Sequence, residues 1–156
     1  MPRDLRMSRM LHVLIHMDRH VERATSDQIA KMISTNPVVV RRMMAGLRER
    51  GIVSSEKGHG GGWQLVRQLA LITLRDVYEA AGHPPLFNIG SRAEPIECLV
   101  EKAVDEKLEA ALRDAEERLL AQFAEIAVEE LAQDFERRFA ELENDILSSV
   151  HWDMID

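Results

Sequence analysis

Apolar residues recur at spacings of three and four positions near the N-terminus, which is the pattern of amphipathic helices. In residues 5–20 the apolar face is formed by Leu5, Met10, Leu11, Leu14, Ile15 and Met17. In residues 24–35 it is formed by Ile29, Ala30 and Ile33. The second segment begins at Thr25 and Ser26, and both residue types are favoured N-caps. The two segments predict the first two helices of the chain.

A third helix is expected over residues 38–50, after a break of four residues at 34–37. Pro37 stands where proline is tolerated in a first helical turn, and Gly51 supplies a stop. The residues that turn inward on this helix are Val40, Met43, Met44 and Leu47. The short break predicts that the second and third helices are close neighbours.

Two short strands, residues 52–55 and 63–66, are expected next, joined by the glycine-rich sequence EKGHGGG. A fourth helix begins with Thr73 as its cap and stops near Gly82. Three helices followed by a two-stranded hairpin make a winged helix-turn-helix. The predicted fold class is therefore mainly α with a small β-hairpin wing.

Residues 83–95 contain three prolines and no periodicity, which indicates a linker. No glycine or proline occurs from residue 96 to residue 156, and a helical stripe runs through Val104, Leu108, Leu112, Ala115, Leu119, Phe123 and Ile126. A helix that projects from a small domain cannot bury such a stripe alone, so a second copy of the chain is the expected partner. The alternative is a helix that folds back on the N-terminal domain. Beyond about Ala127 the stripe drifts, which allows a bend and a further short helix.

These patterns predict a winged helix-turn-helix DNA-binding domain over residues 1–82 and a linker over 83–97. A long helical dimerisation region follows over residues 98–148, and residues 149–156 form a tail that is expected to fray. The predicted dimer-interface residues are Val104, Leu108, Leu112, Ala115, Leu119 and Phe123.

Charge is distributed unevenly between the two halves. Residues 1–76 hold 13 Lys and Arg against 7 Asp and Glu, a balance of +6, whereas residues 77–156 hold 7 against 20, a balance of −13. The net charge of −7 therefore hides a basic half that fits an anionic partner. One cysteine, no apolar run of membrane-spanning length and no apolar signal sequence lead us to expect a cytoplasmic protein with no membrane partner.

The segment SEKGHGGGWQL, residues 55–65, fits three kinds of glycine-rich loop: a phosphate cradle, a metal-binding turn and a hairpin tip. A nucleotide-binding loop requires a helix directly after the glycines, whereas Trp63-Gln64-Leu65 is typical of a strand. The hairpin tip is thus the preferred interpretation. Its backbone is expected to approach the DNA backbone or minor groove, with Lys57 and His59 supplying donors.

In a winged helix-turn-helix the second helix crosses the DNA backbone and the third enters the major groove by its N-terminal end. Asparagine pairs with adenine, arginine with guanine or phosphate, and valine contacts a thymine methyl. The candidate DNA-binding residues are Ser26, Gln28, Thr35, Asn36, Pro37, Val38, Val39, Arg41, Arg42, Lys57 and His59. The alternative for Arg41 and Arg42 is a solvated surface charge.

The motif NPVVVRR, followed by the wing GHGGGW and by ITLRDVYEAAG, resembles the winged-helix regulators of the Rrf-two family over roughly residues 5–125. The resemblance implies a homodimer with a long dimerisation helix. It also implies binding to a pseudo-palindromic operator, usually as a repressor.

Sensing members of that family hold an iron–sulfur cluster through three cysteines, but this chain has only Cys98. The resemblance is therefore closest to the cluster-free branch, and we expect no cofactor. Cys98 is interpreted first as a buried, inert cysteine. A redox sensor or an intersubunit disulfide is the alternative, since a helix N-terminus lowers the pKa of a thiol, although neighbouring glutamates act in the opposite direction.

Two further residue patterns could indicate metal or cofactor sites. His12, His16 and His20 share a face of the first helix, but a fourth ligand is not evident, so no metal site is expected. The methionines Met7, Met10, Met17, Met32, Met43 and Met44 are interpreted as adaptable core residues.

The sequence contains no paired nucleophile and base and no cofactor fingerprint, so it does not predict an enzyme. The predicted function is transcriptional regulation by a homodimer that binds double-stranded DNA and responds to an unidentified small-molecule or redox effector. The alternative is a helical protein-interaction adaptor that keeps the winged-helix scaffold without binding DNA.

Overall fold

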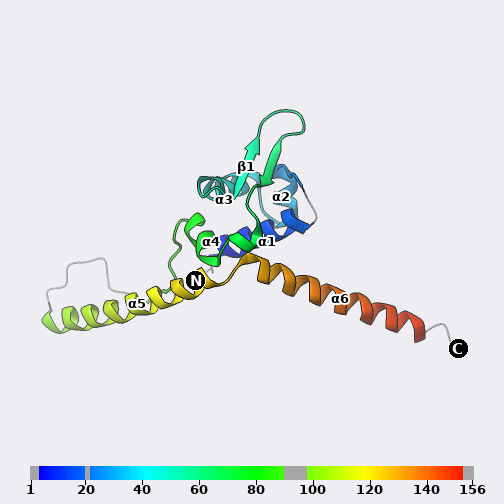
Figure 1. Cartoon of the computed structure of the whole chain (residues 1–156). Coiled ribbons are helices and arrows are strands. Elements are labelled where there is room, and N and C mark those ends of the chain that lie inside the picture. The colour runs from blue at the N-terminus through cyan, green and yellow to red at the C-terminus, as the bar shows by residue number, and fades with distance from the viewer. Residues whose placement is uncertain (1–3, 20–21, 90–97, 153–156) are drawn as a thin grey trace.

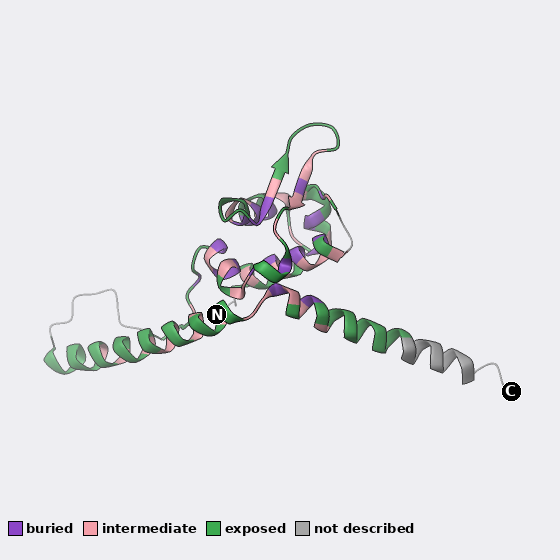
Figure 2. Cartoon of the chain, in the orientation of Figure 1, coloured by how far each residue is buried: buried purple, intermediate pink, exposed green. Residues whose placement is uncertain are grey.

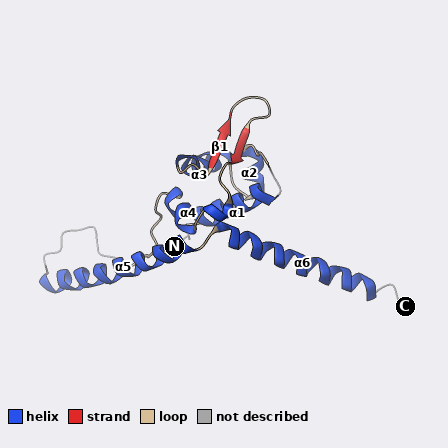
Figure 3. Cartoon of the chain, viewed as in Figure 1, coloured by secondary structure: helices blue, strands red, loops and turns tan. Residues whose placement is uncertain are grey.

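The computed structural model describes residues 4–19, 22–89 and 98–152. The elements are α1 (Arg6–Arg19), α2 (Ser26–Met32), α3 (Pro37–Glu49), β1 (Val53–Glu56), β2 (Gly62–Leu65), the short 3-10 helix η1 (Leu69–Leu71), α4 (Leu74–Ala80), α5 (Leu99–Glu125) and α6 (Val128–Trp152). Figures 1 and 3 show a helical body with one projecting hairpin, and α5 and α6 extending from its base in opposite directions. The predicted fold class is confirmed.

The helix starts follow from their capping residues. The Thr25 hydroxyl accepts a hydrogen bond from the Gln28 amide, and the Gln28 side chain accepts one from the Thr25 amide, which makes a reciprocal capping box. Asn36 Oδ1 accepts from the amides of Val38 and Val39 at the start of α3. Thr73 caps α4, as predicted.

The core is formed where the apolar faces of the first helices meet the inner end of the hairpin. Its fully buried side chains include Met10, Val13, Leu14, Ile29, Val40, Met44, Leu47, Ile52, Val53, Leu69, Ile72 and Val77. The inward-facing residues predicted for α3 are all buried. Each of the first three predicted helices therefore contributes its apolar face to one shared core.

A close contact between helices depends on one glycine that the sequence pattern did not single out. A Cβ placed on Gly46 in α3 would lie 2.1 Å from the carbonyl oxygen of Ala80 in α4. Real Cβ atoms do not approach an oxygen this closely, so any larger residue would push α4 away from α3.

The hairpin is antiparallel, with Val53 opposite Leu65 and Glu56 opposite Gly62. Its strands lie one residue away from the predicted limits: β1 begins and ends one residue later, and β2 begins and ends one residue earlier. Val53 of β1 and Trp63 of β2 are both buried in the core.

The long helical region differs most from the prediction. The chain leaves α5 at Ile126 and makes an extended bridge with the body: the Leu74 amide donates to the Ile126 carbonyl (3.0 Å), and the Val128 amide donates to the Ile72 carbonyl (2.8 Å). Val128 and Ala132 of α6 are 0% exposed and belong to the core of the body. The expected short helix is 25 residues long.

The predicted tail is also partly corrected. α6 continues through Trp152, so residues 149–152 are helical rather than frayed, and residues 153–156 lie outside the described part. In contrast to the body, α5 contains no buried residue, and Figure 2 shows that its surface is mainly exposed.

Candidate nucleic-acid interface

The N-terminal half of α3 presents an exposed apolar and basic surface. Val38 is 51% exposed, and Arg41 and Arg42 are also exposed. Among the described residues neither arginine forms an ion pair with a carboxylate. Their N–H donors are therefore not engaged by a carboxylate of the described residues and can serve another partner.

Asn36 has a structural role at the same place. Its Oδ1 is occupied by two amides of the first turn of α3, so the side chain is fixed as a cap. The prediction that it is available to pair with adenine needs revision, since such a pair uses the same oxygen. Thr35 and Pro37 are half-buried beside it, as is Val39.

The turn of the hairpin carries Lys57 and His59, both exposed. Gly58 and Gly60 have φ of 95° and 75°, and the Gly61 amide donates to the Gly58 carbonyl (3.0 Å). Other residues rarely adopt these backbone angles, so the glycines are required by the turn itself. The tip is a compact loop, and its two polar side chains are exposed to solvent.

The hairpin is fastened to the helix-turn-helix by contacts that the sequence did not reveal. Ala24 and Trp63 exchange two backbone hydrogen bonds, of 3.0 and 2.7 Å. The Trp63 indole N–H donates to the Ser26 hydroxyl (3.0 Å), so Ser26 anchors the wing in addition to any contact with DNA. A Cβ on Gly62 would lie 2.7 Å from the Ala24 carbonyl oxygen, which explains this glycine by close approach.

Two arginines missed in the sequence also support the wing. Arg23 donates to Glu56 (2.6 Å), to the Gly60 carbonyl (3.1 Å) and to Gln64 (3.0 Å). The Arg48 guanidinium lies 5.9 Å from the centre of the Trp63 ring, a cation–π distance. No local pattern marks Arg23, because its partners come from the hairpin more than 30 positions later.

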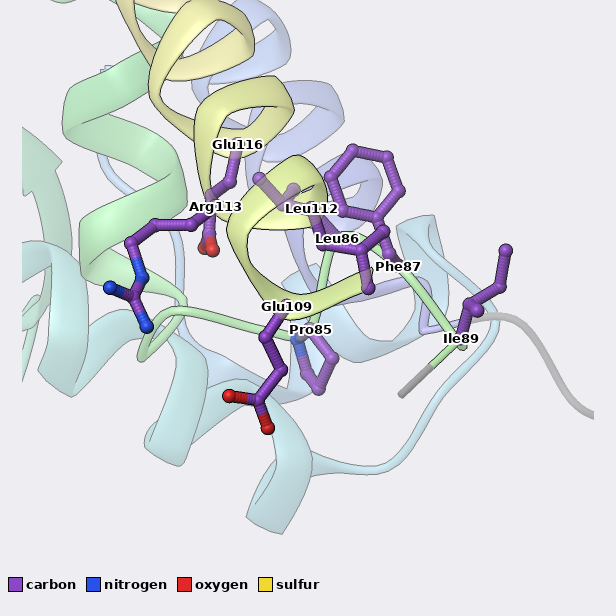
Figure 4. Close-up of a pocket in the computed structure, with 8 residues that line it drawn as sticks. All are labelled: Pro85, Leu86, Phe87, Ile89, Glu109, Leu112, Arg113 and Glu116. Atoms are coloured by element: carbon purple, nitrogen blue, oxygen red, sulfur yellow. The ribbon is translucent and has the colours of Figure 1, made fainter. Parts of the chain in front are cut away.

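A second surface lies along α5. Val104 is 58% exposed, and the other predicted interface residues, Leu108, Leu112, Ala115, Leu119 and Phe123, are half-buried in the single chain. An open hollow of about 420 Å³ lies here, and its lining includes Leu112, Leu86, Phe87 and Ile89 together with the charged residues Glu109, Arg113 and Glu116. Figure 4 shows Leu86 and Phe87 beside Leu112. This side of α5 therefore carries more apolar surface than the stripe alone.

Helix α4 joins α5 to the body. The Tyr78 and Phe123 rings meet edge to face at 6.4 Å. Burial raises the pKa of Tyr78, and the carboxylate of Glu116, with which its hydroxyl forms a hydrogen bond, raises it further. A change in the position of α5 would thus alter the contacts of α4, which packs on α3.

Cys98 is the N-cap residue of α5 and is exposed, so the interpretation as a buried cysteine is wrong for the single chain. The backbone amides of Glu101 and Val100 lower the pKa of the thiol below its usual value. Its role as a redox sensor stays a prediction.

The histidine face of α1 is described only in part. The rings of His12 and His16 lie 4.7 Å apart, and His20 lies outside the described residues. Within the described ranges, no three His, Cys, Asp or Glu side chains gather as a metal cluster would require. None of the helices in the described part combines the length and apolar composition that a membrane crossing requires.

Comparison with known proteins gives a consistent result. The Rrf2 family model, described as "Iron-dependent Transcriptional regulator", matches residues 4–134. The curated relative named "Putative HTH-type transcriptional regulator YwnA", from Bacillus subtilis (strain 168), is 36% identical over 121 residues, which are 73% of this chain and 87% of the relative.

Two solved structures show the same fold. A "putative transcriptional regulator" from Lactobacillus plantarum matches with a TM-score of 0.71 and 23% identity, over 92% of this chain and 98% of that one. CymR (YrzC), the global cysteine regulator of B. subtilis, matches with a TM-score of 0.55 and 21% identity, over 85% and 97%.

The family description mentions iron, and the described residues contain no group of three His, Cys, Asp or Glu side chains that could hold a metal ion. An iron–sulfur cluster is held by several thiolates, and this chain has a single cysteine. We therefore assign no residue to iron, and the expected lack of a cofactor stays a prediction.

The chain belongs to the Rrf2 family of transcriptional regulators, as the resemblance of its motifs predicted. Its relatives are regulators of transcription and not enzymes.

Proposed function

We propose that this Rrf2-family regulator binds a pseudo-palindromic operator in double-stranded DNA as a homodimer and represses transcription. The observation that carries the proposal is the pair Arg41 and Arg42, exposed and without a carboxylate partner in the described structure, on a helix whose opposite face is fully buried. Such a helix is rigid and presents its charges in a fixed direction, as the major groove requires.

The contacts divide between two elements. On α3, Val38 and the two arginines face the bases or the flanking phosphates, while Asn36 fixes the start of the helix. On the wing, Lys57 and His59 reach the sugar-phosphate edge or the minor groove. Arg23 and Ser26 hold the wing in place relative to α2, which packs against α3.

The charge asymmetry sets the orientation on DNA. Of the 20 Lys and Arg residues, 13 lie in the winged-helix half, and residues 77–156 carry a balance of −13. DNA phosphates repel this acidic half, so the body faces the duplex and α5 and α6 face away from it.

The homodimer is supported by the unburied stripe of α5. Its apolar residues repeat at coiled-coil-like spacing over a helix of 27 residues, and none of them is fully buried within the single chain. Pairing of two α5 helices would cover this surface and place two winged-helix bodies on one duplex. Two-fold symmetry of the protein would then match an operator with two half-sites.

The proposal is tested with the variants Arg42→Gln and Arg41→Gln. Each removes one guanidinium and keeps a side chain of similar length, so we expect the Kd for an operator fragment to rise by roughly tenfold or more. If the lost contact is to phosphate, the slope of log K against log salt falls by about one. Affinity is measured by fluorescence anisotropy on a fragment selected from genomic DNA, with the promoter of the chain's own gene as the first fragment.

The matched control is Arg138→Gln on the exposed surface of α6, which we expect to bind DNA as the parent protein does. Circular dichroism must show that all three variants stay folded. Unchanged affinity for both α3 variants would contradict the contact assignment. Failure of the parent protein to bind any genomic fragment would favour the adaptor alternative.

A further inference from the structure

A pocket of about 350 Å³ lies between α1, α3 and the end of α4. It is separate from the tip of the wing and from the stripe of α5. The residues that line it are Arg6, Arg9, Met10, Val39, Arg42, Met43, Ala80 and Ala81. Its volume falls at the small end of the range of about 300–1,000 Å³ that is typical of ligand sites.

The interior of this pocket is apolar. Met10 and Met43 are almost fully buried, and Ala80 and Ala81 close the side formed by α4. Such a lining favours the hydrocarbon part of a ligand and offers no hydroxyl or amide side chain to a strongly hydrated ion.

Three arginines surround the apolar interior, and they differ in how they are paired. Arg6 donates hydrogen bonds to the Asp4 carboxylate at 2.9 and 3.1 Å and to the Ala81 carbonyl at 3.0 Å. These bonds hold its side chain in place beside the pocket. Arg9 and Arg42 have no ion pair within the described residues. The pocket therefore has an uncompensated positive charge beside an apolar cavity.

We infer that this pocket binds a small organic anion, with an apolar body among Met10, Met43 and Ala80 and a carboxylate between Arg9 and Arg42. A carboxylate is the natural complement of the planar guanidinium fork, and the partly enclosed site strengthens the pairing. The apolar lining distinguishes this ligand from a bare phosphate.

The pocket adjoins the surface assigned to DNA, because Arg42 and Val39 belong to α3. A carboxylate that engages Arg42 withdraws that guanidinium from DNA, so the anion weakens operator binding and the operator weakens anion binding by the same factor. This second step rests on the proposed function, whereas the binding of the anion does not.

The anion site is tested without DNA by NMR of protein carrying ¹³C-methyl methionine. The probe is 4-phenylbutyrate, and its neutral amide is the control. We expect the Met10 and Met43 methyl signals to shift saturably with the acid, with a Kd of roughly a millimolar or below, and to be insensitive to the amide. The Met44 methyl, buried on the same helix but outside the pocket, is expected to stay in place.

Variants of Arg9 test whether its positive charge binds the carboxylate of the acid. Arg9→Gln is expected to weaken binding of the acid by roughly tenfold, and Arg9→Lys to restore much of it. Arg75→Gln, on the exposed face of α4 and outside the pocket, is the matched control and is expected to bind the acid normally. Equal binding of acid and amide, unmoved Met10 and Met43 signals, or full binding by Arg9→Gln would each overturn the anion site.

The link to DNA is measured separately. The acid, but not the amide, is expected to lower operator affinity, and this effect should be lost in Arg9→Gln. Normal anion binding with unchanged operator affinity would overturn the competition. If Arg9→Gln weakens operator binding while the methionine signals ignore the acid, these arginines serve a DNA phosphate and the anion site is wrong. DNA binding by the parent protein without the acid tests the proposed function alone.

Discussion

Helices α3 and α5 both carry apolar residues at helical spacing, but α3 buries its apolar face within the chain and α5 does not. α3 has 13 residues and buries Val40, Met43, Met44 and Leu47, whereas α5 has 27 residues and buries none. The difference lies in their neighbours: α3 packs against α1, α2, α4 and the hairpin, while the main contact of α5 is with α4.

The apolar face of α3 is covered by the chain itself, whereas the apolar face of α5 stays uncovered in the single chain. The face of α3 is satisfied inside the body, so its stability is set within the chain. The face of α5 exposes apolar surface that only another molecule can remove from water. Substitutions in the two helices should therefore differ in how their effects depend on protein concentration.

The largest effect is expected for Leu47→Ala in α3. Leu47 is 0% exposed, and its replacement leaves a cavity in the core, so the free energy of unfolding should fall by about 2–5 kcal/mol. Chemical denaturation measures this loss. The loss should be similar at low and high protein concentration, and a loss below about 1 kcal/mol would show that α3 packs less tightly than the structure indicates.

The next effect is expected for Leu112→Asp in α5. Leu112 is half-buried in the single chain, and pairing of two α5 helices would bury a carboxylate at this position further. The dissociation constant of the dimer should therefore rise by roughly hundredfold. Sedimentation equilibrium measures the dissociation, and circular dichroism should show a folded body.

Ala110→Asp is the matched control for this variant, because Ala110 is exposed and lies on the face of α5 opposite the stripe. It should leave the dimer intact. An intact dimer in Leu112→Asp would contradict pairing through α5, and an unfolded body would show that α5 is needed within the chain.

The smallest effect is expected for Asn36→Ala, at the cap of α3. Two amides lose their acceptor, which should lower the free energy of unfolding by about 1 kcal/mol, measured by thermal unfolding. Asn36→Ser retains a capping oxygen and should keep most of the stability. If this stable variant nevertheless loses operator affinity, Asn36 also reads a base.

Sequence reasoning located the elements that depend on near neighbours in the chain. The helices of the body and the hairpin were predicted to within three residues at each end, and the caps at Thr25 and Thr73 were predicted correctly, because caps and periodicity act within a few positions. The arginines of α3 were found for the same reason. Whether they contact DNA remains the proposal tested above.

The missed features all depend on distant parts of the chain. Gly46 matters because Ala80 lies against it, and Arg23 matters because it meets Glu56 and Gly60. The pocket beside Arg9 forms only where α1, α3 and α4 meet. No spacing within one segment marks these positions.

The sequence by itself determined the secondary structure of the body, its basic character and its family, since periodicity, capping and motifs are local properties. Only the tertiary structure decided that α6 returns to the body, with Val128 and Ala132 in the core, while α5 stays unburied. Both helices have apolar stripes, and a stripe specifies that a face must be covered but not by what. The backbone bridge between Ile72–Leu74 and Ile126–Val128 places α6 against the body, whereas the apolar face of α5 stays uncovered in the single chain.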